Sequence, residues 1–405
     1  MNRTRLTTAA ATAVALVGVP ASGAHLPLSY PPGVLPAAAS RPAMGWNSWN
    51  AFGCNITERD VERQADALVS SGLAGAGYRT VTVDDCWFAP TRAPDGSLRA
   101  DPSRFPSGMA ALGAYLHARG LRFGLYESPG ARTCAQLAGT YPGATGSAGH
   151  ETQDAKTFAA WGVDYLKYDW CSAAADPQQQ IIAFTTMRDA LGDTGRPVEY
   201  AINPNSHVAD AVPGRDGVWS GVANQVRVTN DVVPAWRVGT GPLGNQGIAE
   251  AIDQASAPGA TGATGDLDML VAGLPGVSDD EARTQVAMWS MLGSPLIAGN
   301  DLTRMPSAVR NLLADRALIA LDQDASAPAH LVGDAWVRRL SGGRMAVAFV
   351  NDSDHPARVG ATPSSLGWSG PPPAVTDLWS GTSREPSAWV GAELAPHATA
   401  IFDLR

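Results

Sequence analysis

Two short apolar segments of the chain each carry a basic and an acidic side chain at a spacing that brings both to one face of a strand. In YLKYDWC (165–171), the alternation of a β-strand projects Lys167 and Asp169 to the same side. A buried ammonium group beside Asp169 would keep that carboxylate ionised, as a nucleophile requires. A structural ion pair inside the core would produce the same pattern, so this segment alone leaves both interpretations open.

The segment QVRVTND (225–231) repeats the arrangement with Arg227 and Asp231, and it too could hold a structural pair. Hydrolysis of a glycosidic bond requires two carboxyl groups, one that attacks and one that protonates, and Asp169 and Asp231 are candidates for these roles. A separation of about 5 Å between them would indicate retention of anomeric configuration. The sequence does not fix that distance.

Other polar and aromatic residues stand at the ends of expected strands. Asp84 and Asp85 are adjacent and repel each other, so hydroxyl donors or solvent must compensate; a capped loop start with one surface Asp is the alternative. Carboxylates accept hydrogen bonds from hydroxyl groups and aromatic faces pack on sugar C–H surfaces, so a neutral polyhydroxylated ligand fits better than a phosphorylated one. The remaining strand-end residues are Trp49, Tyr126, Glu127, Trp170, Asn203, Asp268 and Asp301.

These residues must be positioned by a repeating strand–helix pattern. Helical spacing between the strands, with Thr57 and Ser278 as N-caps, predicts helices at 57–71, 110–119, 153–161 and 278–291. Eight such units predict a (β/α)8 TIM barrel, with the active face at the C-terminal strand ends. An open doubly wound sheet is the alternative, but its Gly-rich phosphate-binding signature is missing. The expected strands are 44–50, 80–87, 122–128, 165–171, 198–203, 225–231, 266–270 and 295–301.

The pattern changes after about residue 321. Segments such as RMAVAFVN and TAIFDLR alternate apolar and polar residues between turns, which predicts a small C-terminal antiparallel β-sandwich domain. We therefore divide the chain into a catalytic barrel at 41–320 and a β domain at 321–405. The β domain is expected to pack against the barrel, and a sugar-binding accessory role is the alternative.

The N-terminus predicts export. Basic residues, an apolar stretch and small residues near Ala24 have the layout of a signal peptide at 1–24, followed by a Pro/Ala-rich leader at 25–40.

The chain has 405 residues, 45% of them hydrophobic, and a net charge of −9, which argues against nucleic acid and anionic membranes as partners. Zinc is poorly supported, because no Cys-x-x-Cys and no paired histidines occur. Four cysteines fit an oxidising compartment, and three pairings remain open: Cys54, Cys86, Cys134 and Cys171.

Several of these segments resemble glycoside hydrolase family 27, which comprises α-galactosidases, α-N-acetylgalactosaminidases and some β-L-arabinopyranosidases. The resemblance runs from about Arg41 to the C-terminus and implies double displacement without metal or organic cofactor. It implies Asp169 as the nucleophile, Asp231 as the acid/base, and disulfides Cys54–Cys86 and Cys134–Cys171. The motifs are MGWNSWNAFGCN, VTVDDCW, GLYESPGARTC, WGVDYLKYDWC, RVTND, DLDML and SPLIAGNDL. The galactose pocket would be lined by Trp49, Asp84, Asp85, Tyr126, Lys167, Asn203, Arg227, Asp268 and Met269.

The chain departs from the family pattern where many members have Cys-Glu-Trp. Here Ile202-Asn203-Pro204 stands in that place, and the small Ser206 that follows would leave space for an N-acetyl group. The expected substrates are terminal α-galactosides, with α-N-acetylgalactosaminides and β-L-arabinopyranosides as alternatives within the family. A sugar-binding module without catalysis is a further alternative, but such a module would normally lack one of the two catalytic carboxylates. The sequence does not indicate an oligomeric state.

Overall fold

The computed structural model describes residues 41–172, 175–205, 211, 213–239, 244–256 and 263–405. The predicted signal peptide and leader lie outside these residues. No helix within the described ranges is long and apolar enough to cross a membrane.

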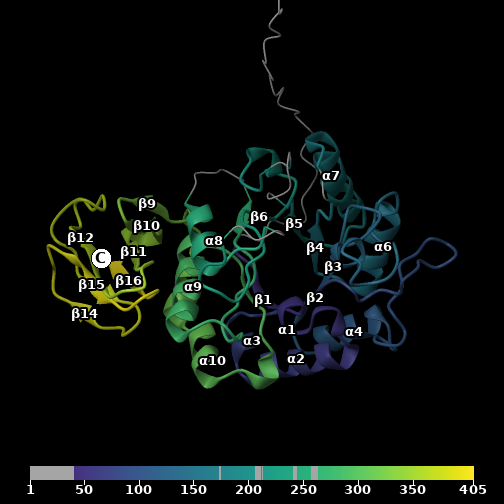
Figure 1. Ribbon diagram of the computed structural model, residues 1–405, viewed down its shortest axis with the longest axis horizontal. Helices are drawn as coiled ribbons and strands as arrows, with labels where there is room; N and C mark the ends of the chain where they lie inside the picture. Colours follow the sequence, from purple (N-terminus) through teal and green to yellow (C-terminus); the bar gives the residue numbers. More distant parts are fainter. Residues whose placement is uncertain (1–40, 173–174, 206–210, 212, 240–243, 257–262) are drawn as a thin grey trace, which may run out of the picture. The chain divides into compact units, whose positions relative to one another are not determined.

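Eight parallel strands form one sheet in the order β7-β6-β5-β4-β3-β2-β1-β8. The sheet closes where the segment after β7 meets β8, because the Leu270 N–H donates to the Ile297 carbonyl at 2.8 Å and Leu270 bridges Ala298. The predicted barrel is confirmed (Figure 1). Its strands are β1 (Met44–Asn47), β2 (Thr80–Val83), β3 (Arg122–Glu127), β4 (Tyr165–Asp169), β5 (Glu199–Asn203), β6 (Gln225–Arg227), β7 (Thr264–Asp266) and β8 (Leu296–Ala298).

Helices connect these strands, and the predicted start signals act as expected. The Thr57 and Ser278 hydroxyls accept the backbone N–H groups of Asp60 and Glu281, and both helices begin with a capping box. The helix at 177–193 was not predicted, although Asp176 caps it and Pro177 occupies its first turn. The helices of the barrel region are α1 (Trp49–Phe52), α2 (Glu58–Ser70), α3 (Leu73–Ala76), α4 (Met109–His117), α5 (Cys134–Leu137), α6 (Glu151–Trp161), α7 (Pro177–Asp193), α8 (Ile248–Ala255), α9 (Asp279–Leu292), α10 (Ser307–Leu313) and α11 (Arg316–Asp322), with short 3₁₀ turns η1 (Gly53–Asn55), η2 (Gly217–Trp219) and η3 (Leu302–Arg304).

Most of the predicted strands extend too far toward the C-terminus. Those expected at 44–50, 80–87, 165–171, 225–231 and 295–301 end at Asn47, Val83, Asp169, Arg227 and Ala298. The strand expected at 266–270 is displaced, because β7 covers Thr264–Asp266. The last backbone bond between β6 and β7 runs from the Val228 N–H to the Asp266 carbonyl at 2.8 Å. Beyond it, backbone N–H groups donate to side chains: Val232 to Asp268 Oδ2 at 2.7 Å, and Asp268 to Asp266 Oδ1 at 2.8 Å.

Apolar side chains form two buried clusters in the barrel region. The smaller cluster contains Met269 and borders buried polar groups, since the Gln225 amide donates to the Tyr165 hydroxyl at 3.0 Å. A larger core fills the layer between the strands and the helices. The sheet is therefore a packed support whose functional groups lie at its edge. The small cluster consists of Ala43, Tyr165, Ala201, Met269 and Ile297.

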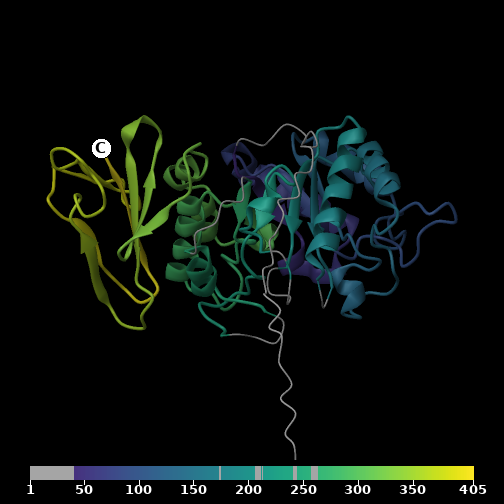
Figure 2. The ribbon, with the colours of Figure 1, turned by 90° about the horizontal axis from the view of Figure 1, so that it is seen from above.

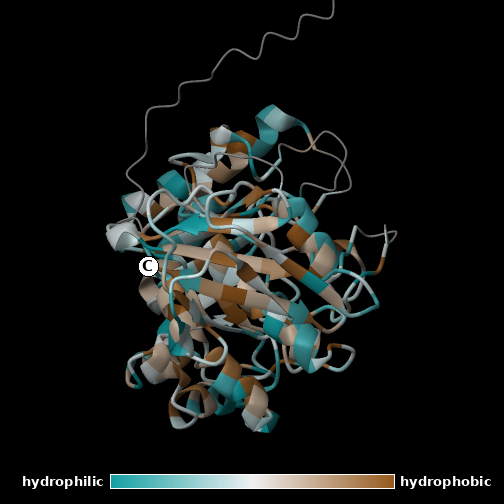
Figure 3. Cartoon of the chain, turned by 90° about the vertical axis from the view of Figure 1, so that its left-hand side faces the viewer, coloured by the Kyte–Doolittle hydropathy of each residue, from teal (hydrophilic) through white to brown (hydrophobic). Residues whose placement is uncertain are grey.

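The strands after α11 are antiparallel, as predicted. Six of them form one sheet in the order β14-β13-β16-β11-β10-β9, and β12 pairs with β15 in a second sheet (Figure 2). The strands are more hydrophobic than the turns that connect them (Figure 3). Along β11, Met345, Val347 and Phe349 belong to one buried cluster, and Ala346 and Ala348 belong to the larger core. The strands are β9 (His330–Val332), β10 (Ala335–Arg339), β11 (Met345–Val350), β12 (Ala357–Ala361), β13 (Val375–Asp377), β14 (Ser383–Arg384), β15 (Val390–Leu394) and β16 (Thr399–Leu404), with the 3₁₀ turn η4 (Ser341–Gly343) between β10 and β11.

Candidate active site

Lys167 joins the ends of β2 and β4. Its Nζ lies 2.8 Å from Asp84 Oδ2 and 3.6 Å from Asp169 Oδ2. The Asn47 amide at the end of β1 also donates to Asp84 Oδ2, at 2.6 Å. Side chains from three strands, β1, β2 and β4, therefore meet at the C-terminal edge of the barrel, and the predicted pairing of Lys167 with Asp169 is present.

Burial and charge act in opposite directions on this pair. Burial raises the pKa of Asp169 to about 7, although the Lys167 ammonium group lowers it. Burial by itself lowers the pKa of Lys167, but Asp169 and Asp84 outweigh it and hold that pKa above its ordinary value. Lys167 therefore stays charged, and it supplies the positive charge that an ionised Asp169 needs.

Arg227 organises a second group of carboxylates. Its guanidinium group lies 2.9 Å from Asp231, 2.5 Å from Asp268 and 3.6 Å from Asp266. The Arg227 side chain is 4% exposed, whereas that of Asp231 is 61% exposed. A buried cation thus holds a carboxylate that remains open to solvent, which is the exposure that a proton-transferring group needs.

Asp268 has an unusual backbone. Its φ is 76°, a left-handed conformation that is uncommon for a residue other than glycine. Its Oδ2 accepts the Val232 N–H at 2.7 Å, and its carbonyl accepts the Trp289 indole N–H at 2.8 Å. Burial raises the pKa of Asp268 to about 6, and Arg227 opposes this shift. Such strain is typical of functional sites.

The two groups influence each other electrostatically. Burial, Lys167 and Asp84 have the largest effects on the pKa of Asp169. The next largest come from the second group: the charge of Arg227 lowers this pKa, and that of Asp231 raises it. The combined site carries more carboxylates than cations, and ionised carboxylates accept hydrogen bonds without donating any. Ligand hydroxyl groups are therefore the natural donors for this site.

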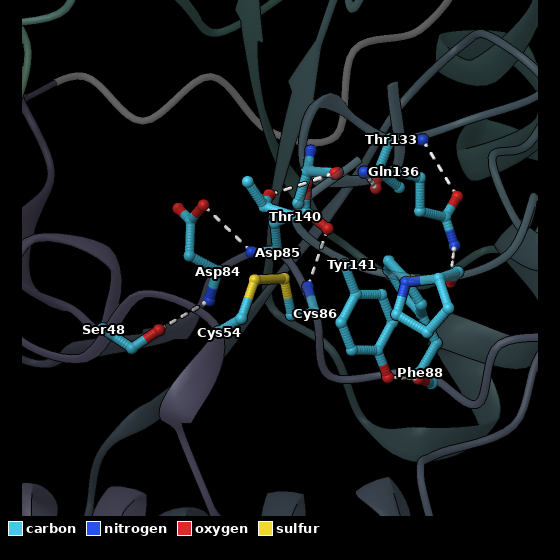
Figure 4. Close-up of a disulfide and its surroundings, with 12 residues drawn as sticks. Ser48, Cys54, Asp84, Asp85, Cys86, Phe88, Thr133, Gln136, Thr140 and Tyr141 are labelled. Atoms are coloured by element: carbon cyan, nitrogen blue, oxygen red, sulfur yellow. Dashed lines mark hydrogen bonds between the residues drawn. A yellow bond between two sulfur atoms is a disulfide. The ribbon is translucent and has the colours of Figure 1, made fainter. Parts of the chain in front are cut away.

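Asp85 differs in orientation from Asp84. Its Oδ1 accepts the Cys86 N–H at 2.7 Å and its Oδ2 accepts the Ala135 N–H at 2.9 Å. Figure 4 shows the two carboxyl groups turned away from each other beside the Cys54–Cys86 disulfide. Burial raises the pKa of Asp85 to about 6. Asp85 thus ties the loop after β2 to the start of α5.

Aromatic side chains border the charged group. The Tyr126 ring lies 5.3 Å from Lys167 Nζ, and its hydroxyl contacts Cys171 Sγ at 3.2 Å. Cys171 is bonded to Cys134, so both disulfide pairings implied by the resemblance are confirmed. Trp49 begins α1 directly after β1 and is 36% exposed, which leaves an indole face available to a ligand.

Comparison with known proteins agrees with this arrangement. A family model described as alpha galactosidase A matches residues 41–324, and one described as the alpha galactosidase C-terminal beta sandwich domain matches residues 333–404. The chain belongs to this α-galactosidase family, glycoside hydrolase family 27.

Individual family members are similar over most of their length. An α-galactosidase A from Cellvibrio japonicus is 38% identical over 78% of this chain and 77% of its own, and an α-galactosidase from Oryza sativa is 34% identical over 90% and 84%. The crystal structure of α-galactosidase I from Mortierella vinacea has a TM-score of 0.82 at 32% identity, covering 91% of this chain and 98% of that one. A Saccharomyces cerevisiae α-galactosidase solved with raffinose has a TM-score of 0.78 at 26% identity, covering 90% and 98%.

Within this family member, the remaining predicted residues lie in different surroundings. Asn203 ends β5 and is buried, and its Oδ1 accepts the Asn205 N–H at 2.9 Å. Met269 follows Asp268 and packs inside the barrel. Ser206 lies outside the described residues.

Two strand-end acids are used structurally. Asp301 caps η3 through the Thr303 N–H and accepts the Gln64 amide at 2.6 Å. Glu127 is buried, and its Oε1 accepts the Ser128 N–H at 2.9 Å. Burial holds the pKa of Glu127 well above its ordinary value.

Two contributors to the site were not predicted as functional residues. Asn47 is the partner of Asp84, and Asp266 is a partner of Arg227. Both stand in motifs that were recognised, MGWNSWN and DLDML. The signal that could have identified them is their place at the end of a strand, where a polar residue must face either a ligand or another polar strand end.

Proposed function

We propose that this protein is a retaining exo-α-galactosidase in which Asp169 is the nucleophile and Asp231 is the acid/base. The observation that carries the proposal is the pair of cation-held carboxylates, Asp169 beside buried Lys167 and Asp231 beside buried Arg227. The family membership supports the reaction class. The assignment of each residue is the one that the family resemblance implies, and the charge, burial and exposure of the two carboxylates support it.

In the first step, Asp169 attacks the anomeric carbon of the terminal galactose from the side opposite the leaving group. A C–O bond to Asp169 forms as the glycosidic C–O bond breaks, and Asp231 donates its proton to the departing oxygen. Lys167 stabilises the carboxylate before attack. Arg227 keeps the carboxyl group of Asp231 in place as it loses its proton.

In the second step, water enters where the leaving group departed. The Asp231 carboxylate accepts a proton from that water, the water oxygen bonds to the anomeric carbon, and Asp169 is released as a carboxylate. Two inversions at one carbon give net retention. Both carboxyl groups return to their starting protonation states, so no other reactant is needed.

We assign substrate recognition to Asp84, Asp268 and the aromatic side chains. Asp84 is held by Lys167 and Asn47, and so it presents a fixed acceptor to sugar hydroxyl groups. We propose that Asp85 reinforces this acceptor through the loop it ties, and that it contacts sugar only if its carboxyl group turns. Trp49 and Tyr126 are proposed walls for the sugar ring, with Asn203, Met269 and Arg227 completing the pocket.

We also propose that the protein is secreted and acts on terminal α-galactosides of oligosaccharides or glycoconjugates. Two disulfides support an oxidising compartment, and the predicted signal peptide supports export. A Saccharomyces cerevisiae relative was solved with raffinose, which makes this class of oligosaccharide a reasonable first substrate.

Proton NMR of the reaction on 4-nitrophenyl α-galactoside tests the proposal. We expect α-galactose to appear first and β-galactose to follow only by mutarotation. Initial formation of β-galactose would exclude the retaining mechanism. Faster cleavage of the matched α-N-acetylgalactosaminide or β-L-arabinopyranoside would exclude the substrate assignment while leaving the mechanism intact.

A further inference from the structure

Asp231 lies on a segment whose position the sheet alone does not set. We call residues 228–239 the acid/base segment; it begins after the last residue of β6, Arg227. Its Trp236 is only 8% exposed, although the strand ended nine residues earlier. A buried tryptophan five residues beyond an exposed acid indicates that the segment is held from its far end.

The partners of Trp236 lie in two connections between the C-terminal strands. Its indole N–H donates to Asp352 Oδ1 at 3.0 Å, and Asp352 follows β11. Its ring stacks on His397, with ring centroids 4.5 Å apart and planes 12° from parallel. The neighbouring Arg237 pairs with the same Asp352 and lies 2.8 Å from Asp253 of α8.

His397 is itself fixed by several contacts. Its φ is 59°, in the tight turn between β15 and β16. Its Nδ1 lies 2.8 Å from Glu281 of α9, and its carbonyl accepts the Thr284 hydroxyl at 2.7 Å. The stacking surface offered to Trp236 is therefore attached both to the β domain and to a barrel helix.

Backbone hydrogen bonds connect the held tryptophan to the acid. The Asp231 carbonyl accepts the Gln246 N–H at 2.9 Å, and the Val233 N–H donates back to the Gln246 carbonyl at 2.9 Å. The Trp236 carbonyl accepts the Ala249 N–H at 3.0 Å at the start of α8. A displacement of Trp236 would therefore be transmitted along a short, bonded segment to Asp231.

We propose that Trp236, Asp352 and His397 are positioning residues for the acid/base, and that the C-terminal β domain thereby takes part in proton transfer. The proposal rests on the assignment of Asp231 given above. The ion pair of Arg237 is exposed and screened by solvent. The stacking and the indole hydrogen bond are better shielded and should carry most of the effect.

Leaving-group dependence separates positioning from general stability. Trp236→Phe removes the indole donor but keeps an aromatic ring, and Asp352→Ala removes the acceptor. Either variant breaks the same hydrogen bond, so one suffices if the other does not fold. We expect kcat/KM for phenyl α-galactoside to fall about tenfold, while that for 2,4-dinitrophenyl α-galactoside falls about twofold or less, because the better leaving group needs little proton donation.

Arg283→Ala is the matched control, since Arg283 of α9 stacks on Trp379 of the β domain at 4.1 Å and does not belong to the acid/base segment. It should alter stability without changing the ratio between the two substrates. In addition, Asp352→Ala should cost almost no further activity when it is added to Asp231→Ala. Asp352 would act through the carboxyl group of Asp231, which Asp231→Ala has already removed.

Equal losses on both substrates, or full activity on both, in Trp236→Phe and Asp352→Ala would overturn the positioning role alone. The same would follow if Arg283→Ala changed the ratio of kcat/KM between the two substrates by as much as these variants do. If Asp231→Ala itself shows no leaving-group dependence, the acid/base assignment fails and the positioning role fails with it. The two kinds of failure are therefore distinguished by the Asp231 variant.

Discussion

Arg227 holds Asp231 at 2.9 Å although one side chain is buried and the other is largely exposed. Arg227 is the last residue of β6, so the rigid sheet fixes the cation, and the cation in turn restrains a carboxylate that lies beyond the strand. The carboxylate can still exchange protons with solvent and substrate. This combination of restraint and access distinguishes Asp231 from the better buried Asp169 and is the physical basis for giving the two acids different roles.

Asp231→Ala should slow substrates according to their leaving groups. We expect kcat/KM for phenyl α-galactoside to fall by about 10³ and that for 2,4-dinitrophenyl α-galactoside by about tenfold or less, because a good leaving group departs without a proton. Steady-state kinetics on a series of aryl α-galactosides measures the slope against leaving-group pKa. An unchanged slope would contradict the role of Asp231 as the acid.

Asp169→Asn should abolish turnover while the fold is retained. The amide has nearly the same shape but cannot form the covalent intermediate, so kcat should fall by at least about 10⁴. Circular dichroism and a thermal melt check the fold, and binding of galactose by calorimetry checks the pocket. Near-normal rates in a homogeneous preparation would show that another group is the nucleophile.

The sequence predicted most of the architecture because barrel strands and capped helices leave local signals. The N-caps Thr57 and Ser278 begin helices where expected, and the period-two spacing of Lys167 and Asp169 brings their charges to one site. Both disulfide pairings followed from the family resemblance, since spacing alone allowed three.

What the sequence missed depends on contacts between distant segments. The strand that ends at Arg227 was predicted too long, and the strand before Asp268 was placed two residues too late, because an apolar alternation continues past the point where side-chain contacts replace the ladder. The orientation of Asp85 toward Ala135 depends on a loop 50 residues away. The anchoring of Trp236 by Asp352 joins residues 116 positions apart, and no local pattern reports such a contact.

Stability of the Asp169→Asn variant should depend on pH in a defined direction. Burial places the folded pKa of Asp169 at about 7, above its ordinary value of 3.8. The group therefore favours folding below about pH 4, and this contribution is lost as the pH rises through 7. Asparagine does not titrate, so the variant should gain stability relative to the wild type between pH 4 and 7, on the order of 1–3 kcal/mol.

Asp85 and Asp268 are present in both proteins, so their contributions to the pH dependence of stability largely cancel in the difference. Urea unfolding at pH 4, 5.5 and 7 measures the difference, and a constant difference would contradict the raised pKa.

Removal of the Cys134–Cys171 disulfide should affect the site as well as stability. The bond spans 37 residues and joins the start of α5 to the residue two positions after Asp169, beside Tyr126. A loop of this length corresponds to a loss of about 4 kcal/mol in unfolding free energy by the chain-entropy relation. We expect the double substitution Cys134→Ser/Cys171→Ser to lower the melting temperature and to raise KM, since Tyr126 loses a fixed neighbour. Cys54→Ser/Cys86→Ser opens a loop of similar length, 32 residues, beside Asp85 instead of Asp169, and provides the comparison for stability. A lower melting temperature with an unchanged KM in Cys134→Ser/Cys171→Ser would show that this disulfide acts only through general stability.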